Sequence, residues 1–187
     1  MPDDQRMSQE DFLNNLSDMS SAKPSPMAQP GVTDNSSPDG KMSQEEFLNY
    51  ISQIESSGGK NTKHPTVHSG VNAGSNAIGK YGLMPNTVRD TVKRGVASGD
   101  LPQDMSEIAS RDDAGIKNLL SNYPASETMI ANSLAHRVLN KYNDPNMAAY
   151  SWNQGTNLTP DQIKQRDFMN SDYVQKFGRV QNMLGKK

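Results

Sequence analysis

The chain has 187 residues, a formal net charge of −2, no cysteine, and low contents of hydrophobic (33%) and aromatic (6%) residues. The charge balance excludes a general basic field for nucleic acid. The lack of cysteine excludes disulfides and thiolate metal sites, and no apolar run is long enough to span a membrane. The low apolar content predicts that part of the chain lies outside any core.

Two segments in the first third of the chain repeat one another. Residues 6–19 (RMSQEDFLNNLSDM) match residues 41–54 (KMSQEEFLNYISQI). Each copy predicts the start of a helix, because a serine followed three residues later by an acid is the pattern of a capping box. Ser43 and Glu46 fit this pattern in the second copy, and Asp11 makes a shorter version of it in the first.

The segment between the copies indicates a linker, since residues 20–41 are rich in Pro, Ser and Gly. We therefore divide the chain into an N-terminal helix (1–19), this linker and a folded domain (42–187). The first helix is either a spare duplicate or a docking helix for a partner or a second copy. We favour docking, because a short isolated helix is marginal in water. The acidic start of the chain has no apolar segment after it, so we expect no secretory signal.

The folded domain is predicted to be mainly helical. Asp112, Ser126 and Thr159 are the expected N-caps. Residues 56–80 have several glycines and little periodicity, which indicates a loop with at most a weak hairpin. Helices are expected near residues 43–55, 86–95, 112–122, 125–142, 145–153, 159–167 and 171–184.

Glu55 ends the first helix of this domain, on its apolar side and directly before a glycine-rich turn. Cleavage of a glycosidic bond needs an acid that stays protonated near neutral pH. Burial favours the protonated form of a carboxyl group, and Ile51 and Ile54 can supply apolar surroundings. Gly58 and Gly59 let the backbone turn sharply and leave one side open. Taken alone, a helix-terminal glutamate is more often solvated.

Three stretches together favour catalysis: IESSGG (54–59), AIGKYGLMPNT (77–87) and AAYSWNQG (148–155). Their order and spacing resemble the lytic transglycosylase family of the lysozyme-like superfamily, closest to the forms found in bacteriophage virions. That family has a Glu-Ser pair ending its first helix, a Gly-Leu-Met-Gln-type stretch running into Met-Pro-x-Thr, and a later Ala-Tyr-Asn-x-Gly stretch. The resemblance covers about residues 42–160 and implies a mainly α, lysozyme-like domain of the SLT type.

The resemblance implies a reaction with a single catalytic carboxylate. Glu55 would protonate the bond between N-acetylmuramic acid and N-acetylglucosamine and then act as a base on the C6 hydroxyl, giving a 1,6-anhydro product without water. No acidic residue lies in the other two stretches. Asp90, Asp100 and Asp104 stay open as partners for a hydrolytic mechanism that uses water.

The resemblance also implies a set of substrate contacts. The usual glutamine of the second stretch falls on Gly82, so its side-chain hydrogen bond to substrate is missing. In the third stretch either Trp152 or Tyr150 takes the place of the family's tyrosine, and a lone tryptophan is as often core as cleft. A serine at a helix end can be a turn residue, and an asparagine before Gly155 can be a C-cap. The expected substrate-binding residues are Ser56, Tyr81, Met84, Tyr150, Trp152 and Asn153.

We expect neither a cofactor nor a metal. His64 and His68 are four residues apart, but they lie in a Pro/Gly loop without a neighbouring glutamate. His64 is a further candidate for a substrate contact.

The hypothesis is a peptidoglycan lytic transglycosylase that is carried in a phage virion and acts on glycan strands in the host periplasm. Other virion proteins would be its partners, through residues 1–41. The alternatives are a muramidase that hydrolyses the same bond, an inactive virion structural protein and a wall anchor that only binds.

Overall fold

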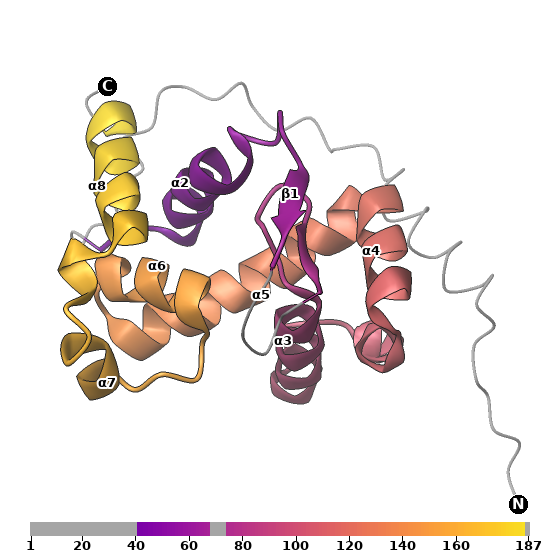
Figure 1. Ribbon diagram of the computed structural model, residues 1–187. Coiled ribbons are helices and arrows are strands. Elements are labelled where there is room, and N and C mark those ends of the chain that lie inside the picture. The colour runs from indigo at the N-terminus through magenta and orange to yellow at the C-terminus, as the bar shows by residue number, and fades with distance from the viewer. Residues whose placement is uncertain (1–40, 68–73, 186–187) are drawn as a thin grey trace, which may run out of the picture. The chain divides into compact units, whose positions relative to one another are not determined.

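The computed structural model describes residues 41–67 and 74–185, and this part of the chain is mainly helical (Figure 1). The predicted N-terminal helix, all but the last residue of the predicted linker, and His68 lie outside the described residues. The α-helices are α2 (Gln44–Ser56), α3 (Pro85–Ser98), α4 (Asp113–Asn122), α5 (Pro124–Tyr142), α6 (Pro145–Gln154), α7 (Pro160–Lys164) and α8 (Asp172–Leu184).

The smaller elements complete the domain. Two 3-10 helices, η1 (Gln103–Ser110) and η2 (Phe168–Asn170), precede α4 and α8. The strands β1 (Lys63–Thr66) and β2 (Asn76–Ile78) pair antiparallel and form a small hairpin. The prediction of a mainly α chain is therefore confirmed, as is the weak hairpin within residues 56–80. No helix among the described residues is long and apolar enough to cross a membrane.

Helix α2 begins with the predicted capping box. The Ser43 hydroxyl accepts from the Glu46 backbone N–H at 3.1 Å, and the Glu46 carboxylate accepts from the Ser43 N–H at 2.9 Å. Phe47 and Ile51 are fully buried on the face that packs against α5 and α8. The helix ends at Ser56, and its C-cap Ser57 has a left-handed backbone (φ 53°) that closes the last turn.

Helix α5 is the centre of the core. It contacts α2, α3, α4 and α6, and Figure 1 shows α3 and α4 near its first half and α6 near its second. Ile130, Leu134 and Val138 recur at helical spacing and are buried. On the α2 side the core continues through aromatic rings, with Phe47 packing edge-on against Trp152 and tilted against Phe177.

Two of the three expected N-caps of the later helices are confirmed. The Asp112 carboxylate caps α4, and Thr159 forms a capping box with Gln162 at the start of α7. Ser126 is not a cap, because α5 begins two residues earlier at Pro124, where a proline suits the first helical position. Ser126 is instead fully buried within the helix.

Two other expectations differ from the structure. The helix expected over 159–167 ends at Lys164, and Asp167 takes a left-handed backbone (φ 49°) that a helix cannot continue through. Helix η1 was not predicted. It has two buried residues, Met105 and Ile108, which is too short an apolar pattern to recognise in the sequence.

A tight loop follows the hairpin and leads to α3. Ile78 and Leu83 exchange two backbone hydrogen bonds, of 2.9 and 3.0 Å, and thereby close the four residues 79–82 into a turn. Gly79 and Gly82 stand at its two ends with φ of 70° and 64°, a conformation that residues with a side chain rarely adopt. This turn, residues 79–82, contacts both of the acidic residues described below.

Candidate active site

Glu55 lies in a cleft of about 490 Å³ between the hairpin and the ends of three helices. It stands in the last turn of α2, and its side chain is partly exposed. The rest of the lining comes from the hairpin and the turn after it, from the start of α3, from the middle of α5 and from the end of α6. These residues are His64, Pro65, Val67, Ala77, Gly82, Leu83, Met84, Thr87, Leu134, Trp152, Asn153 and Gln154. Glu55 is the one carboxylate among these described residues.

Tyr173 of α8 holds the Glu55 carboxyl group. Its hydroxyl donates a hydrogen bond of 2.7 Å to Oε1 of Glu55 across 118 residues of sequence. Burial raises the pKa of Glu55, while the Tyr173 hydrogen bond and the charges of His64 and Lys176 act in the opposite direction. Burial, followed by the nearby Glu55 charge, places the pKa of Tyr173 well above its ordinary value, so the tyrosine stays a neutral donor.

Gly82 leaves room for the second oxygen of Glu55. A Cβ atom at Gly82 would overlap Oε2 of Glu55 and stand 2.6 Å from Cδ and 3.0 Å from Cγ. Any residue other than glycine would therefore push the carboxyl group away, in addition to the strain of its positive φ. The family has glutamine at the position of Gly82, and the space that the Glu55 carboxyl group occupies is a steric reason for glycine in this chain.

The three sequence stretches that suggested catalysis meet at the turn 79–82. From the first stretch, the Ser56 hydroxyl donates to the backbone oxygen of Lys80 at 2.7 Å and accepts from the Gly59 N–H at 2.8 Å. From the third, the Trp152 indole N–H donates to the backbone oxygen of Tyr81 at 3.2 Å. The middle stretch is therefore fixed from two sides beside Glu55.

A second acid, the buried Glu127 of α5, supports the same turn. Its carboxylate accepts the Tyr81 backbone N–H at 2.9 Å, and its side chain fills the space that a Cβ at Gly79 would need. Burial raises the pKa of Glu127, while its hydrogen bonds from the backbone of Tyr81 and Lys80 favour the charged form. Because it bonds the backbone and lies outside the Glu55 cleft, Glu127 is a positioning residue.

Three of the six expected substrate-binding residues line the cleft. Met84 is half-buried at the start of α3, Trp152 closes the side near α6, and Asn153 is exposed at the end of that helix. The Asn153 amide oxygen accepts from Gln154, and the C-cap of α6 is Gly155.

The other three lie outside the cleft lining. The Ser56 hydroxyl is engaged with backbone atoms, so its contacts here are those of a residue that holds the turn. Tyr81 is buried, and the Lys80 ammonium lies 5.2 Å from its ring centroid. Tyr150 packs edge-on against Phe168 in the core. Of Tyr150 and Trp152, the two candidates for the position of the family's tyrosine, Trp152 is the one that lines the cleft.

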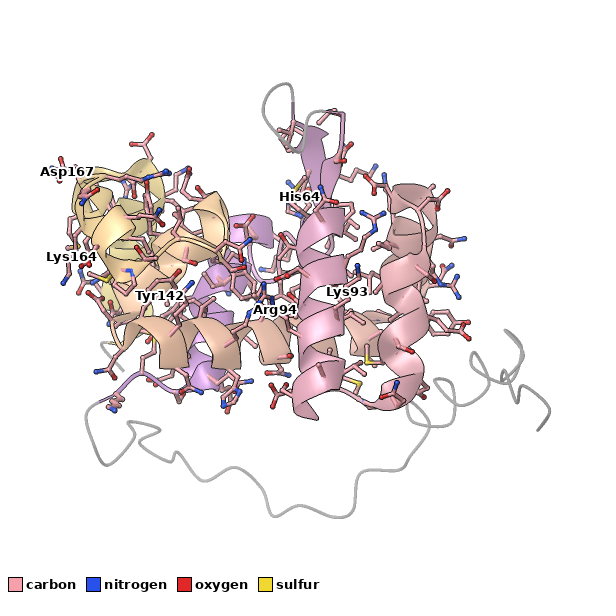
Figure 2. All side chains as sticks on the ribbon, turned by 90° about the horizontal axis from the view of Figure 1, so that it is seen from below. His64, Lys93, Arg94, Tyr142, Lys164 and Asp167 are labelled. Atoms are coloured by element: carbon pink, nitrogen blue, oxygen red, sulfur yellow. The ribbon has the colours of Figure 1, made fainter. Side chains whose placement is uncertain are left out.

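His64 lies on the hairpin at the edge of the cleft (Figure 2). Its Nε2 is 2.8 Å from the backbone oxygen of Gly79, and since a carbonyl can only accept, Nε2 is the donor of this hydrogen bond. Among the described residues, no group of three potential metal-binding side chains is present.

The three aspartates that stayed open as a second carboxylate do not line the cleft. Asp90 forms ion pairs with Arg94 at 2.8 Å and Arg137 at 3.1 Å, and Asp100 accepts from Ser98 at 2.7 Å. Asp104 belongs to η1.

Two residues of the site were missed in the sequence. Nothing in the sequence around Tyr173 indicates a contact with Glu55. Tyr173 stands at the start of α8 next to the buried residues Val174 and Phe177, where an aromatic residue is expected to pack in the core. Glu127 did carry one, since it lies three and seven residues before Ile130 and Leu134, on the buried stripe of its helix. An acid on an apolar stripe is a candidate for a buried, bonded carboxylate.

Neither protein-family models, nor curated proteins, nor solved structures give a match for this chain. The case for a function therefore rests on the geometry of the site and on the sequence stretches that form it.

Proposed function

We propose that the domain is a lysozyme-like peptidoglycan lytic transglycosylase with Glu55 as its only catalytic carboxyl group. The observation that carries this proposal is the environment of Glu55. A carboxyl group with a raised pKa lies in an open cleft, and a neutral tyrosine holds one of its oxygens. Such a group retains its proton at a pH where ordinary glutamates have lost theirs, which general acid catalysis requires.

The two oxygens of Glu55 have different surroundings, and this supports different roles for them in the proposed reaction. Oε1 accepts the Tyr173 hydroxyl, so the transferable proton belongs on Oε2, the oxygen beside Gly82. Oε2 donates this proton to the glycosidic oxygen as the bond from C1 breaks. The carboxylate then takes the proton of the C6 hydroxyl while O6 bonds to C1. The Tyr173 hydrogen bond and the charges of His64 and Lys176 favour the carboxylate between the two steps.

The lack of a second acid among the described lining residues favours this reaction over hydrolysis by two carboxylates. A muramidase of the retaining or inverting kind needs a second carboxyl group across the bond. Glu127 does not supply it, since its carboxylate bonds the backbone of the turn 79–82.

The delivery of the enzyme in a phage virion, its action in the host periplasm and its docking to other virion proteins through residues 1–41 are proposals that rest on the sequence resemblance. Residues 1–40 lie outside the described part of the chain.

The test is a digest of purified peptidoglycan, with the soluble products identified by mass spectrometry. The wild type is expected to release anhydro-ended fragments, and Glu55→Gln to release none while keeping its fold. Glu45→Gln, a substitution of an exposed glutamate on the same helix, is the matched control and should act as the wild type. Turnover by the Glu55→Gln variant would refute the assignment, and reducing ends would make the enzyme a hydrolase. A folded wild type that releases nothing would favour the structural or anchoring alternatives.

A further inference from the structure

A second cleft of about 660 Å³ lies against the hairpin, and nothing in the proposed reaction uses it. Its lining comes from β1, β2, α4 and the start of α5. Pro124, which is exposed, and Ala77, which is partly exposed, provide its apolar surface; Ile78 and Leu120 also line it but are only 3% and 1% exposed. Figure 1 shows the hairpin between α2 and the α4 end of α5.

Three exposed lysines surround this apolar surface: Lys63 of β1, Lys80 of the turn 79–82 and Lys117 of α4. No ion pair joins any of them to a carboxylate within the described part of the chain. The one acid of the lining, Glu127, is buried, and its carboxylate accepts backbone hydrogen bonds. In a chain of net charge −2, the cleft is thus a local concentration of positive charge beside apolar surface.

His64 and Ala77 line both clefts, so the two clefts lie against the same part of the hairpin. A side branch of a ligand whose main chain passes Glu55 would reach the second cleft by crossing the hairpin at these two residues. The chemistry that fits the branch is an acidic peptide with small apolar side chains, whose carboxylates meet the lysines and whose methyl groups cover the apolar surface.

We propose that the second cleft binds the carboxylate-bearing stem peptide of a muramic acid residue held in the Glu55 cleft. This inference rests on the proposed function, because peptidoglycan is the glycan whose branches are short, alanine-containing, acidic peptides. The site makes the enzyme specific for peptide-bearing strands, and its contacts weaken with salt.

Binding is measured by calorimetry with the full-length chain carrying Glu55→Gln, which avoids turnover. The ligand is a synthetic stem tetrapeptide, and its carboxyl-amidated form is the control ligand. Lys63→Gln, Lys80→Gln and Lys117→Gln are combined in one variant. The matched control replaces three exposed lysines outside both clefts, Lys41, Lys93 and Lys164, the last two of which are seen on α3 and α7 in Figure 2. Thermal unfolding checks that both variants are folded.

The cleft variant is expected to bind the free peptide about tenfold more weakly, the scale for three partly solvated charge contacts. The control variant should stay within about twofold. Raising the salt from about 0.1 M to about 1 M, which shortens the Debye length from about 10 Å to about 3 Å, should remove most of the difference. Equal binding by the two variants, equal binding of the amidated peptide, or no binding by the parent protein would overturn the inference. Equally strong binding of a glycerol-phosphate polymer would also overturn it, because the cleft would then be a general anion patch.

A digest of intact and peptide-stripped glycan strands by the wild type separates this inference from the proposed function. Cleavage of both substrates at equal rates refutes the peptide site and leaves the transglycosylase proposal standing. Lysine-dependent peptide binding without any cleavage refutes the transglycosylase and leaves the peptide site.

Discussion

Replacing Gly82 by alanine should move the Glu55 carboxyl group and thereby reduce stability and, if the proposed function holds, activity. The backbone at Gly82 has φ 64°, a left-handed conformation that costs a residue with a Cβ about 1–2 kcal/mol. The new Cβ would also stand 2.6 Å from Cδ of Glu55, well inside the ordinary contact distance of about 3.5–4 Å. The carboxyl group must therefore shift by about 1 Å.

This shift breaks the 2.7 Å hydrogen bond from Tyr173 to Glu55, which adds about 1 kcal/mol. We expect Gly82→Ala to lower the free energy of unfolding by about 2–3 kcal/mol in total. A displacement of this size at a reacting group lowers kcat by about a hundredfold. Urea unfolding and the rate of release of soluble fragments from peptidoglycan measure the two effects.

Gly99→Ala is the matched control. Gly99 also has a positive φ (82°), but no atom lies within 4 Å of the place that its Cβ would take. This variant should therefore lose only the backbone contribution of about 1–2 kcal/mol, with full activity. If Gly82→Ala is no less stable than Gly99→Ala and keeps activity within about twofold, then Gly82 does not set the position of Glu55, and the steric explanation is wrong.

Three further predictions follow from the hydrogen bonds of the site. Tyr173→Phe removes a hydrogen bond that favours the carboxylate of Glu55, so its pKa should rise further and the alkaline limb of the pH–rate profile should move to higher pH; an unmoved limb would contradict this. Ser56→Ala leaves buried backbone groups without their partner and should cost about 1–3 kcal/mol in urea unfolding. Ser52→Ala, whose hydroxyl bonds only within its own helix, should cost less, and equal losses would argue against the role of Ser56. Because the pKa of Glu127 is raised in the folded state, the folded protein keeps a proton on this residue at a pH where the unfolded chain has lost it. The contribution of Glu127 to the free energy of unfolding therefore falls as pH rises from the ordinary carboxyl range through the raised pKa. Glu127→Gln removes that fall, so its stability relative to the wild type should increase with pH in this window, and a constant difference would refute it.

The sequence by itself determined the features that depend on neighbours within one helical turn. The capping box of Ser43 and Glu46 and the cap at Asp112 were correctly predicted, because their hydrogen bonds join residues three apart. The expected helix over residues 125–142 has the same basis, since its buried residues Ile130, Leu134 and Val138 recur at the helical period. The end of the first helix of the domain was also predicted, and it placed Glu55 in the last turn before the glycines.

Only the tertiary structure decided which side chains surround Glu55. Tyr173 reaches it because α8 packs against α2, and this contact joins residues 118 positions apart. The rotation of α6 about its axis places Trp152 in the cleft and Tyr150 in the core, although both are aromatic and only two residues apart. Likewise, the missing side chain at Gly82 is explained only by where the Glu55 carboxyl group lies. Packing between helices sets these relations, and no periodicity along the chain encodes them.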